Sequence, residues 1–261
     1  MGNTRRHGTQ SIERTVLLMK ELAARGGIGW RLGDLATSCK LDRGTAHRIL
    51  ACLVRERLVR QRASDRRYVP GPLLFELALS VPALCAFQSA CAAPLARAAK
   101  RLNGVSLLCL RSGSDFVCAA RSGSLQIKAL TIDLGTRRPL IVSVGGVAIL
   151  IALPKDEARA IVAENMKQVA RFGAARIRSL QRMIRQSESR GYGVSESEIV
   201  PGVSAFAVPI LDRQKRPFAS ITIVGPSDNF PSVRVPEIIA TLEHEARAIA
   251  REAARIPGTA G

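Results

Sequence analysis

Residues 41–60 read LDRGTAHRILACLVRERLVR, and this stretch carries the clearest structural signal in the chain. Its apolar side chains recur at positions i, i+3, i+4 and i+7, which is the spacing of one helix face; they are Ala46, Ile49, Leu50 and Leu53. Asp42 precedes them and is a residue type that caps helix N-termini. The pattern predicts an amphipathic helix that begins just after Asp42.

Two more helices are predicted upstream. SIERTVLLMKELAARGG, from residue 11, has a helical apolar period and stops at two glycines, with an expected apolar face of Ile12, Val16, Leu17, Met19 and Leu22. RLGDLATSCKL, from residue 31, places Leu32, Leu35 and Ala36 on one face of a short helix. The break near Lys40 then leaves a tight turn before the helix that follows Asp42.

A β-hairpin is predicted downstream. VRQRASDRRYVPG, residues 59–71, alternates around a Ser64–Asp65 turn, and four arginines expected to be exposed flank the tip: Arg60, Arg62, Arg66 and Arg67. These arginines either contact phosphates or the minor groove of DNA, or form a solvated edge that resists strand aggregation. Helix, short helix, helix and hairpin in this order predict a winged helix-turn-helix.

The helix after Asp42 is the expected recognition helix. Its N-terminal polar residues, away from the apolar stripe, are Arg43, Gly44, Thr45, His47 and Arg48. A helix-turn-helix inserts this end of its second helix into the major groove, where such side chains reach base edges and phosphates. Any one of them alone would be read as a solvated helix surface. Together with the hairpin they predict binding to double-stranded DNA.

The charge of the chain agrees with a polyanionic partner. The formal charge is +18, from 39 basic and 21 acidic residues, and the first 70 residues carry 15 basic against 6 acidic side chains. An Arg-rich composition also follows from codon bias in GC-rich genomes. Arg5 and Arg6 either add phosphate contacts or belong to a disordered tail. No apolar run near the N-terminus suggests a signal peptide or membrane span, so a cytoplasmic protein without a membrane partner is expected.

The rest of the chain alternates between strand and helix patterns. A linker helix is expected within residues 72–82, followed by a long helix that accommodates Pro94. Strands are expected in VSLLCL, DFVCAAR, IKALTID, VSAFAVPIL and FASITIV, with helices between them and a closing helix over residues 235–255. The pattern predicts an α+β domain with helices on one face of a sheet. The expected domains are therefore residues 1–71, 72–82 and 83–261.

Catalytic and metal-binding motifs are missing from the sequence. The six cysteines, read as small core residues of a reducing compartment, show no C-x-x-C pair, although Cys109 and Cys118 could face each other across a hairpin. The histidines, His7, His47 and His244, accompany no hydrolase or metalloprotease motif. No metal, cofactor or catalytic residue is expected. Two alternatives stay open: an enzyme with Cys109 or Cys118 as nucleophile, and a DNA-binding scaffold that senses no ligand.

Several stretches resemble the IclR family of bacterial regulators. They are QSIERTVLLMKELA, LDRGTAHRILACLVRERLVR and GPLLFELA in the first part, and LGTRRPLIVSVGGVAILIALP and SRGYGVSESEIVPGVSAFAVPILDRQKRPFASITIVGP in the second. The resemblance implies a GAF-like α+β effector domain behind the winged helix-turn-helix. It also implies a palindromic operator, a homodimer or dimer of dimers, and a small organic or aromatic acid as effector.

The resemblance also implies an effector pocket. Position by position, the pocket would be lined by Val144, Gly145, Ser195, Ala205, Thr222 and Val224. The backbone N–H groups of Val144 and Gly145 would hold a carboxylate at a helix N-terminus. Many family members carry more polar residues at these positions. The apolar set here implies either a more hydrophobic ligand or a site that has lost its ligand, and ordinary core packing is the alternative for each residue.

Overall fold

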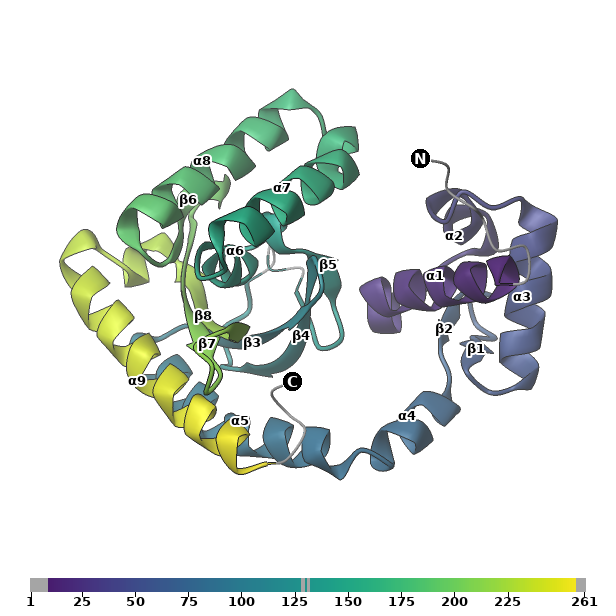
Figure 1. Cartoon of the computed structure of the whole chain (residues 1–261), viewed down its shortest axis with the longest axis horizontal. Helices are drawn as coiled ribbons and strands as arrows, with labels where there is room; N and C mark the ends of the chain where they lie inside the picture. Colours follow the sequence, from purple (N-terminus) through teal and green to yellow (C-terminus); the bar gives the residue numbers. More distant parts are fainter. Residues whose placement is uncertain (1–8, 128–129, 131, 257–261) are drawn as a thin grey trace. The chain divides into compact units, whose positions relative to one another are not determined.

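A computed structural model describes residues 9–127, 130 and 132–256, which form two compact units (Figure 1). The N-terminal unit comprises the described residues up to Pro82, and the C-terminal unit comprises most of those from Ala83 onward. Arg5, Arg6 and His7 lie outside the described residues. Among the described helices, none has both the length and the apolar character needed to cross a membrane.

The N-terminal unit has the predicted order of elements. Its elements are α1 (Gln10–Arg25), a 3-10 turn (Gly26–Ile28), α2 (Leu32–Ser38), α3 (Arg43–Arg55), β1 (Val59–Gln61), β2 (Tyr68–Pro70) and α4 (Pro72–Leu79). The small core joins α1, α2, α3 and the hairpin through side chains that include Leu18, Leu35, Leu50 and Tyr68. Trp30 is buried beside them and donates its indole N–H to the Glu21 carbonyl at 2.8 Å. The winged helix-turn-helix arrangement is thus confirmed.

The predicted apolar face of α1 is partly wrong. Leu18 and Leu22 are the residues buried on this helix, whereas Ile12, Val16 and Leu17 are exposed. The run Val16-Leu17-Leu18-Met19 places apolar side chains all around the helix, so spacing alone permits more than one buried face. Packing against α2 and the hairpin selects the face that carries Leu18.

The C-terminal unit is built on one six-stranded sheet with the order β5-β4-β3-β8-β7-β6. Its strands are β3 (Val105–Ser112), β4 (Asp115–Ser122), β5 (Arg137–Pro139), β6 (Gly193–Val200), β7 (Val203–Leu211) and β8 (Pro217–Pro226). The helices are α5 (Pro82–Leu102), α6 (Val144–Ile151), α7 (Lys155–Val169), α8 (Ala174–Arg190) and α9 (Val235–Arg255). Mixed helices and antiparallel strands confirm the α+β class.

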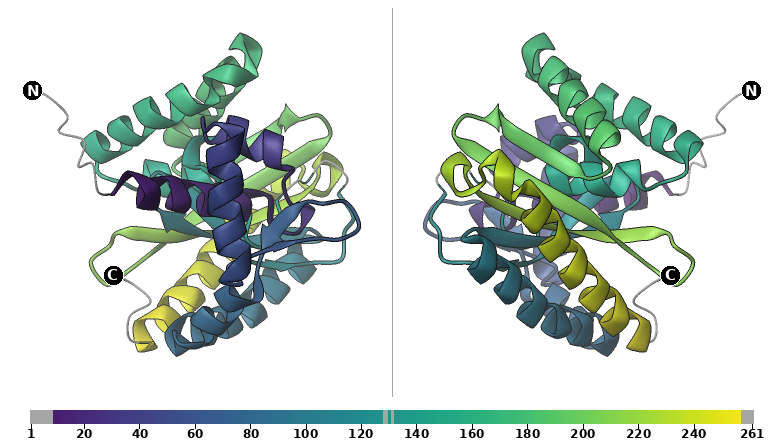
Figure 2. Two further views of the ribbon diagram at one scale, coloured as in Figure 1. Left: turned by 90° about the vertical axis from the view of Figure 1, so that its right-hand side faces the viewer. Right: turned by 90° about the vertical axis from the view of Figure 1, so that its left-hand side faces the viewer.

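Helices cover both faces of this sheet, so the prediction of helices on one face is wrong. One apolar cluster joins the sheet to α6, α7 and α8, and a second joins it to α5 and α9. Figures 1 and 2 show α5 and α9 lying together on one side of the sheet. Leu107 and Leu108 on β3 belong to different clusters, because successive side chains of a strand point to opposite faces.

The strand predicted over IKALTID is also wrong. The described residues of this stretch, Ile127, Leu130, Ile132 and Asp133, lie outside the strands, and the edge strand is β5. Ile127, Leu130 and Ile132 are partly buried against the cluster that contains α6. These apolar side chains therefore cover the core and are not part of a strand.

Four of the six cysteines are core residues as predicted, namely Cys39, Cys91, Cys109 and Cys118. Cys52 and Cys85 are exposed, so the core interpretation is wrong for these two. Cys52 precedes the buried Leu53 on α3 and falls outside the apolar stripe. Cys109 and Cys118 are register partners on β3 and β4, and both are free thiols.

Candidate functional site

The N-terminal end of α3 presents polar side chains to solvent. The Asp42 carboxylate accepts a hydrogen bond from the Thr45 backbone N–H at 2.7 Å and so caps the helix. Hydrogen bonding with the Thr45 side chain, and then with its backbone N–H, lowers the pKa of Asp42 below its usual value. Beyond the cap, Arg43, Gly44, His47 and Arg48 are exposed, while Thr45 is half-buried. The predicted recognition residues are therefore accessible.

A hollow of about 500 Å³ adjoins this end of α3. It is lined by residues from α2, α3 and the hairpin: Arg31, Leu32, Gly33, Asp34, Arg43, His47, Gln61, Asp65, Arg66 and Tyr68. The fold thus brings Arg43 and His47 together with Arg66. Sequence reasoning missed Arg31 and Gln61. The position of Arg31 immediately before α2 was an available signal, because the first helix of a helix-turn-helix crosses the DNA backbone.

Two hairpin arginines form hydrogen bonds and ion pairs within the N-terminal unit. Arg62 makes a two-pronged ion pair with Asp65, at 2.9 and 2.6 Å, and donates to the carbonyl oxygens of Gly27 and Ile28. Arg67 donates to the Gly29 carbonyl at 3.2 Å. The expectation of four exposed arginines is therefore wrong for Arg62 and Arg67, because their guanidinium groups hold the hairpin against the segment after α1.

The other two hairpin arginines are exposed, as expected for Arg60 and Arg66. Arg66 has a left-handed backbone conformation, with φ of 59°, and its side chain lines the hollow beside α3. The tip of the hairpin thus presents Arg66 toward the hollow beside α3, while Arg62 and Arg67 hold the tip against the segment after α1.

The Arg62–Asp65 pair yields a pH prediction. Hydrogen bonding by Arg62 lowers the pKa of Asp65 to about 2. A carboxyl group whose folded-state pKa is lowered stabilises the fold above its unfolded-state pKa, near 3.9, and loses this effect as the pH falls through the folded value. We expect Asp65→Asn to lower the melting temperature at pH 7. The variant should also lose less stability than the wild type between pH 4 and pH 2.

Fluorescence of Trp30, the one tryptophan of the chain, reports unfolding of the N-terminal unit in this experiment. Asp34→Asn is the matched control, because Asp34 lines the same hollow and its replacement removes the same negative charge. An identical acid response in both variants would contradict the role of the Arg62–Asp65 pair.

A second cavity, of about 130 Å³, lies within the C-terminal unit. All six predicted effector residues line it: Val144 and Gly145 from the start of α6, Ser195 from β6, Ala205 from β7, and Thr222 and Val224 from β8. The strand register accounts for part of this set, because Ser195 pairs with Ala205 and Ala205 pairs with Val224. Residues separated by up to 80 positions therefore meet at one cavity.

The start of α6 brings hydrogen-bond donors to this cavity. The Ser143 hydroxyl caps the helix by accepting from the Gly146 N–H at 3.0 Å. The N–H groups of Val144 and Gly145 lie in the first turn, where a helix provides no backbone acceptor. The hydroxyls of Ser195 and Thr222 are buried and make no hydrogen bond within the described part of the chain. These donors and hydroxyls suit a polar or anionic ligand.

Two arginines that sequence reasoning missed also line the cavity. They are Arg138 on β5 and Arg176 on α8, and they are the charged side chains among its described lining residues. Desolvation, together with the positive charge of Arg176, lowers the pKa of Arg138. Arg176 donates to the Ile199 carbonyl at 3.2 Å. The charged side chains that line the cavity in the described part of the chain are therefore basic, although the six predicted residues taken alone are largely apolar.

Comparison with known proteins identifies the family. The family model described as the IclR helix-turn-helix domain matches residues 11–63. The model described as the bacterial transcriptional regulator IclR C-terminal matches residues 88–251, more than half of the chain. The chain belongs to the IclR family. The resemblance inferred from the sequence is thus confirmed, and with it a transcriptional regulator with a DNA-binding helix-turn-helix.

Individual IclR-family relatives match over nearly the whole chain. The glycerol operon regulatory protein of Streptomyces coelicolor is 27% identical over 249 residues, covering 93% of this chain and 96% of that protein. An IclR-family regulator of Brucella abortus aligns over 96% of each chain with a TM-score of 0.72 and 20% identity. An IclR homologue of Microbacterium hydrocarbonoxydans, solved with 4-hydroxybenzoate, covers 94% of this chain and 99% of that chain, with a TM-score of 0.68 and 18% identity. These structures establish the shared fold.

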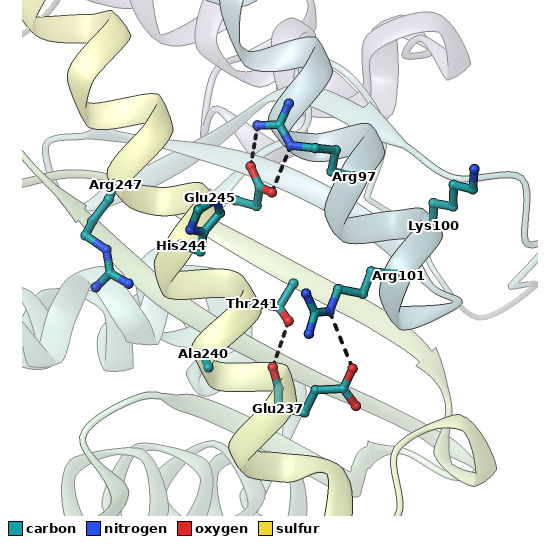
Figure 3. Close-up of a pocket in the computed structure, with 9 residues that line it drawn as sticks. All are labelled: Arg97, Lys100, Arg101, Glu237, Ala240, Thr241, His244, Glu245 and Arg247. Carbon is teal, nitrogen blue, oxygen red and sulfur yellow. Dashed lines mark hydrogen bonds and ion pairs between the residues drawn. The ribbon is translucent and has the colours of Figure 1, made fainter.

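A third hollow, of about 810 Å³, lies along α5 and α9 of this IclR-family chain (Figure 3). Two of its arginines pair with glutamates that also line the groove. Arg97 makes a two-pronged pair with Glu245, at 3.0 and 2.6 Å, and Arg101 lies 3.5 Å from Glu237. His244 is exposed on α9, as predicted for a solvated helix residue. None of the predicted DNA or effector residues lies here, so this hollow is separate from both candidate sites.

Proposed function

We propose that this IclR-family regulator binds a small organic acid in the cavity of its C-terminal unit, and that the acid changes its affinity for operator DNA. The observation that carries the proposal is the pair Arg138 and Arg176, which line the cavity while no acidic side chain does so among the described residues. Half-buried positive charges favour an anionic ligand, because a nearby negative charge offsets the cost of their desolvation.

The size of the cavity limits the ligand. A volume of about 130 Å³ is small for a ligand pocket, since such pockets commonly have about 300–1,000 Å³. This volume favours a short aliphatic acid or a compact single-ring acid. The homologue of Microbacterium hydrocarbonoxydans was solved with a compound of the latter kind, 4-hydroxybenzoate. The sequence left two alternatives for this cavity, a hydrophobic ligand and a site that has lost its ligand. The two arginines instead favour a small anionic ligand.

We further propose that α3 reads DNA with Arg43, Gly44, Thr45, His47 and Arg48, and that Arg66 adds a contact from the hairpin. The support is that Arg43, His47 and Arg66 line one hollow, and that Gly44 and Arg48 are exposed on the same helix. Thr45 is half-buried, and its hydroxyl accepts a hydrogen bond from Arg48 at 3.4 Å. Arg62 and Arg67 act indirectly by holding the hairpin. A palindromic operator, bound by a homodimer or dimer of dimers, remains part of the proposal.

The alternative of an enzyme has less support. It requires a thiolate from Cys109 or Cys118, because thiolates rather than thiols are the nucleophiles. Burial raises the pKa of the Cys109 thiol above its usual range and that of Cys118 to about 11. Both groups are therefore neutral thiols at pH 7.

A panel of aliphatic and aromatic acids tests the proposed function. A ligand at 100 times its dissociation constant stabilises the folded state by about 2.7 kcal/mol, so the acid that binds should raise the melting temperature measured by circular dichroism. It should also be recovered unchanged after incubation and should alter the affinity for DNA. Consumption of the acid would favour an enzyme, and a flat response across the panel would favour a ligand-independent scaffold.

A further inference from the structure

Helix α8 carries an excess of positive charge that the other long helices of the C-terminal unit do not share. It contains five arginines and one acidic residue, Glu188. α7 contains three basic and three acidic side chains, and α9 contains three basic and four acidic ones. α5 has three basic side chains, but Arg97 and Arg101 pair with glutamates of α9. An arginine-rich composition would affect these helices alike, so it does not account for the excess on α8.

Three of these arginines form a stripe along the outer side of α8. Arg178, Arg182 and Arg185 stand at positions i, i+4 and i+7, so they lie on one side of the helix, and all three are exposed. α8 packs on β6 and α6 at the outside of the C-terminal unit (Figure 1). Its buried residues lie on the opposite side of the helix; they are Leu180, Met183, Ile184 and Ser187. The arginine stripe therefore faces away from the sheet.

The arginine stripe has little counter-charge of its own. Arg178 and Arg185 make no ion pair or hydrogen bond in the described part of the chain, and Arg182 comes within 3.8 Å of Glu198. Like charges four residues apart on a helix repel each other and destabilise it. A stretch that breaks a local rule in this way is typical of a functional surface. The stripe is therefore suited to a partner that carries several negative charges.

We propose that the arginine stripe is a second DNA-binding surface, which contacts the phosphate backbone of the duplex held by the helix-turn-helix. Arg178 and Arg185 are seven residues apart, about 10 Å along the helix, and one DNA strand carries about three phosphates over the same distance. The C-terminal unit is tethered to the DNA-binding domain, which raises the local concentration of DNA at the stripe. An anionic membrane fits less well, because the apolar side of α8 is buried in the fold and cannot enter lipid.

Replacing the stripe by glutamine should weaken DNA binding without changing sequence preference. The full chain with Arg178→Gln, Arg182→Gln and Arg185→Gln is titrated, by fluorescence anisotropy over a range of salt concentrations, with a long duplex that contains the operator and with a random duplex of the same length. The affinity for both duplexes should fall tenfold or more and by the same factor, because phosphate contacts carry no sequence information. The log–log slope with salt should fall by about 0.9 for each lost contact. Loss of the recognition helix would instead reduce the preference for the operator.

The matched control removes the same charge from α9 of the same unit. Arg247, Arg251 and Arg255 are exposed, and two of them pair with glutamates, so replacing all three by glutamine should leave the affinity and the salt slope unchanged. An equal loss in both triple variants would show that net charge is responsible and would overturn the proposal. An unchanged salt slope in the stripe variant would overturn it as well. Lost binding to phosphatidylglycerol vesicles with unchanged DNA binding would assign the stripe to a membrane instead.

Melting temperatures measured by circular dichroism separate lost binding from lost folding. Both sets of arginines are exposed, so the two triple variants should melt with the wild type. If the stripe variant does not fold, the single variants Arg178→Gln and Arg185→Gln take its place, and each should lower the salt slope by about 0.9. Slopes equal to that of the wild type in both single variants would overturn the proposal.

Discussion

Replacing Arg43 and Arg48 together by alanine is expected to weaken operator binding by about 2–6 kcal/mol per protomer, since each arginine that contacts DNA contributes about 1–3 kcal/mol. That range corresponds to a loss of affinity from about thirtyfold to more than ten-thousandfold. Both side chains are exposed at the N-terminal end of α3, and neither belongs to the core. The fold should therefore remain intact while binding is lost.

Fluorescence anisotropy on a duplex selected by the wild-type protein from a random-sequence library measures this effect. Repeating it over a range of salt concentrations counts phosphate contacts, because each lost contact lowers the log–log slope by about 0.9. Arg55→Ala is the matched control, since Arg55 ends the same helix and pairs with Glu56. Affinity that is unchanged in the double variant would remove α3 as the recognition helix.

Gly146→Ala is expected to destabilise the C-terminal unit by about 3 kcal/mol or more, at the upper end of the cost of overpacking a core. Gly146 is buried in the first turn of α6. An added Cβ atom would overlap the backbone carbonyl group of Leu140, which no side-chain rotation can relieve. The start of α6, which lines the cavity of the C-terminal unit, must therefore move. Urea unfolding followed by circular dichroism measures the loss of stability.

The neighbouring glycine provides the comparison. A Cβ atom at Gly145 would meet only the ends of side chains, namely the Thr222 hydroxyl at 2.5 Å, the Ser220 hydroxyl at 3.0 Å and the Cys109 sulfur at 3.2 Å. Gly145→Ala should therefore cost less stability than Gly146→Ala, but the new methyl group would occupy the cavity wall and reduce acid binding. Equal stability of the two variants would show that the position of α6 is not set by this contact.

The local sequence was sufficient to predict the helices and the hairpin of the DNA-binding unit. The Asp42 cap, the stripe from Ala46 to Leu53 and the Ser64–Asp65 turn each depend on residues a few positions apart, so their physics is present in the sequence. The same holds for the closing helix α9. Where local signals permitted two solutions, as on α1 with its run of four apolar residues, packing decided which face became buried.

The residues that line the cavity of the C-terminal unit were predictable only in part, and through family resemblance rather than through spacing. Its six predicted residues come from four elements, and no local rule brings Gly145 to Thr222. β6 was missed by pattern because SESE, residues 195–198, lacks apolar alternation. The positions of Arg138 and Arg176 at the cavity could not be predicted either. Arginines are mostly exposed, and no local pattern marks those that line a cavity.

The sequence by itself determined the class of the protein: a winged helix-turn-helix, with polar residues at the start of the helix after Asp42, and an α+β domain behind it. The tertiary structure alone decided which hairpin arginines are free, that helices cover both faces of the sheet, and that two positive charges line the cavity. The physical reason is the separation along the sequence of the residues that interact. Caps, periodicity and turns act between residues near in sequence, whereas ion pairs, burial and the charge of a cavity depend on residues that meet only when the chain has folded.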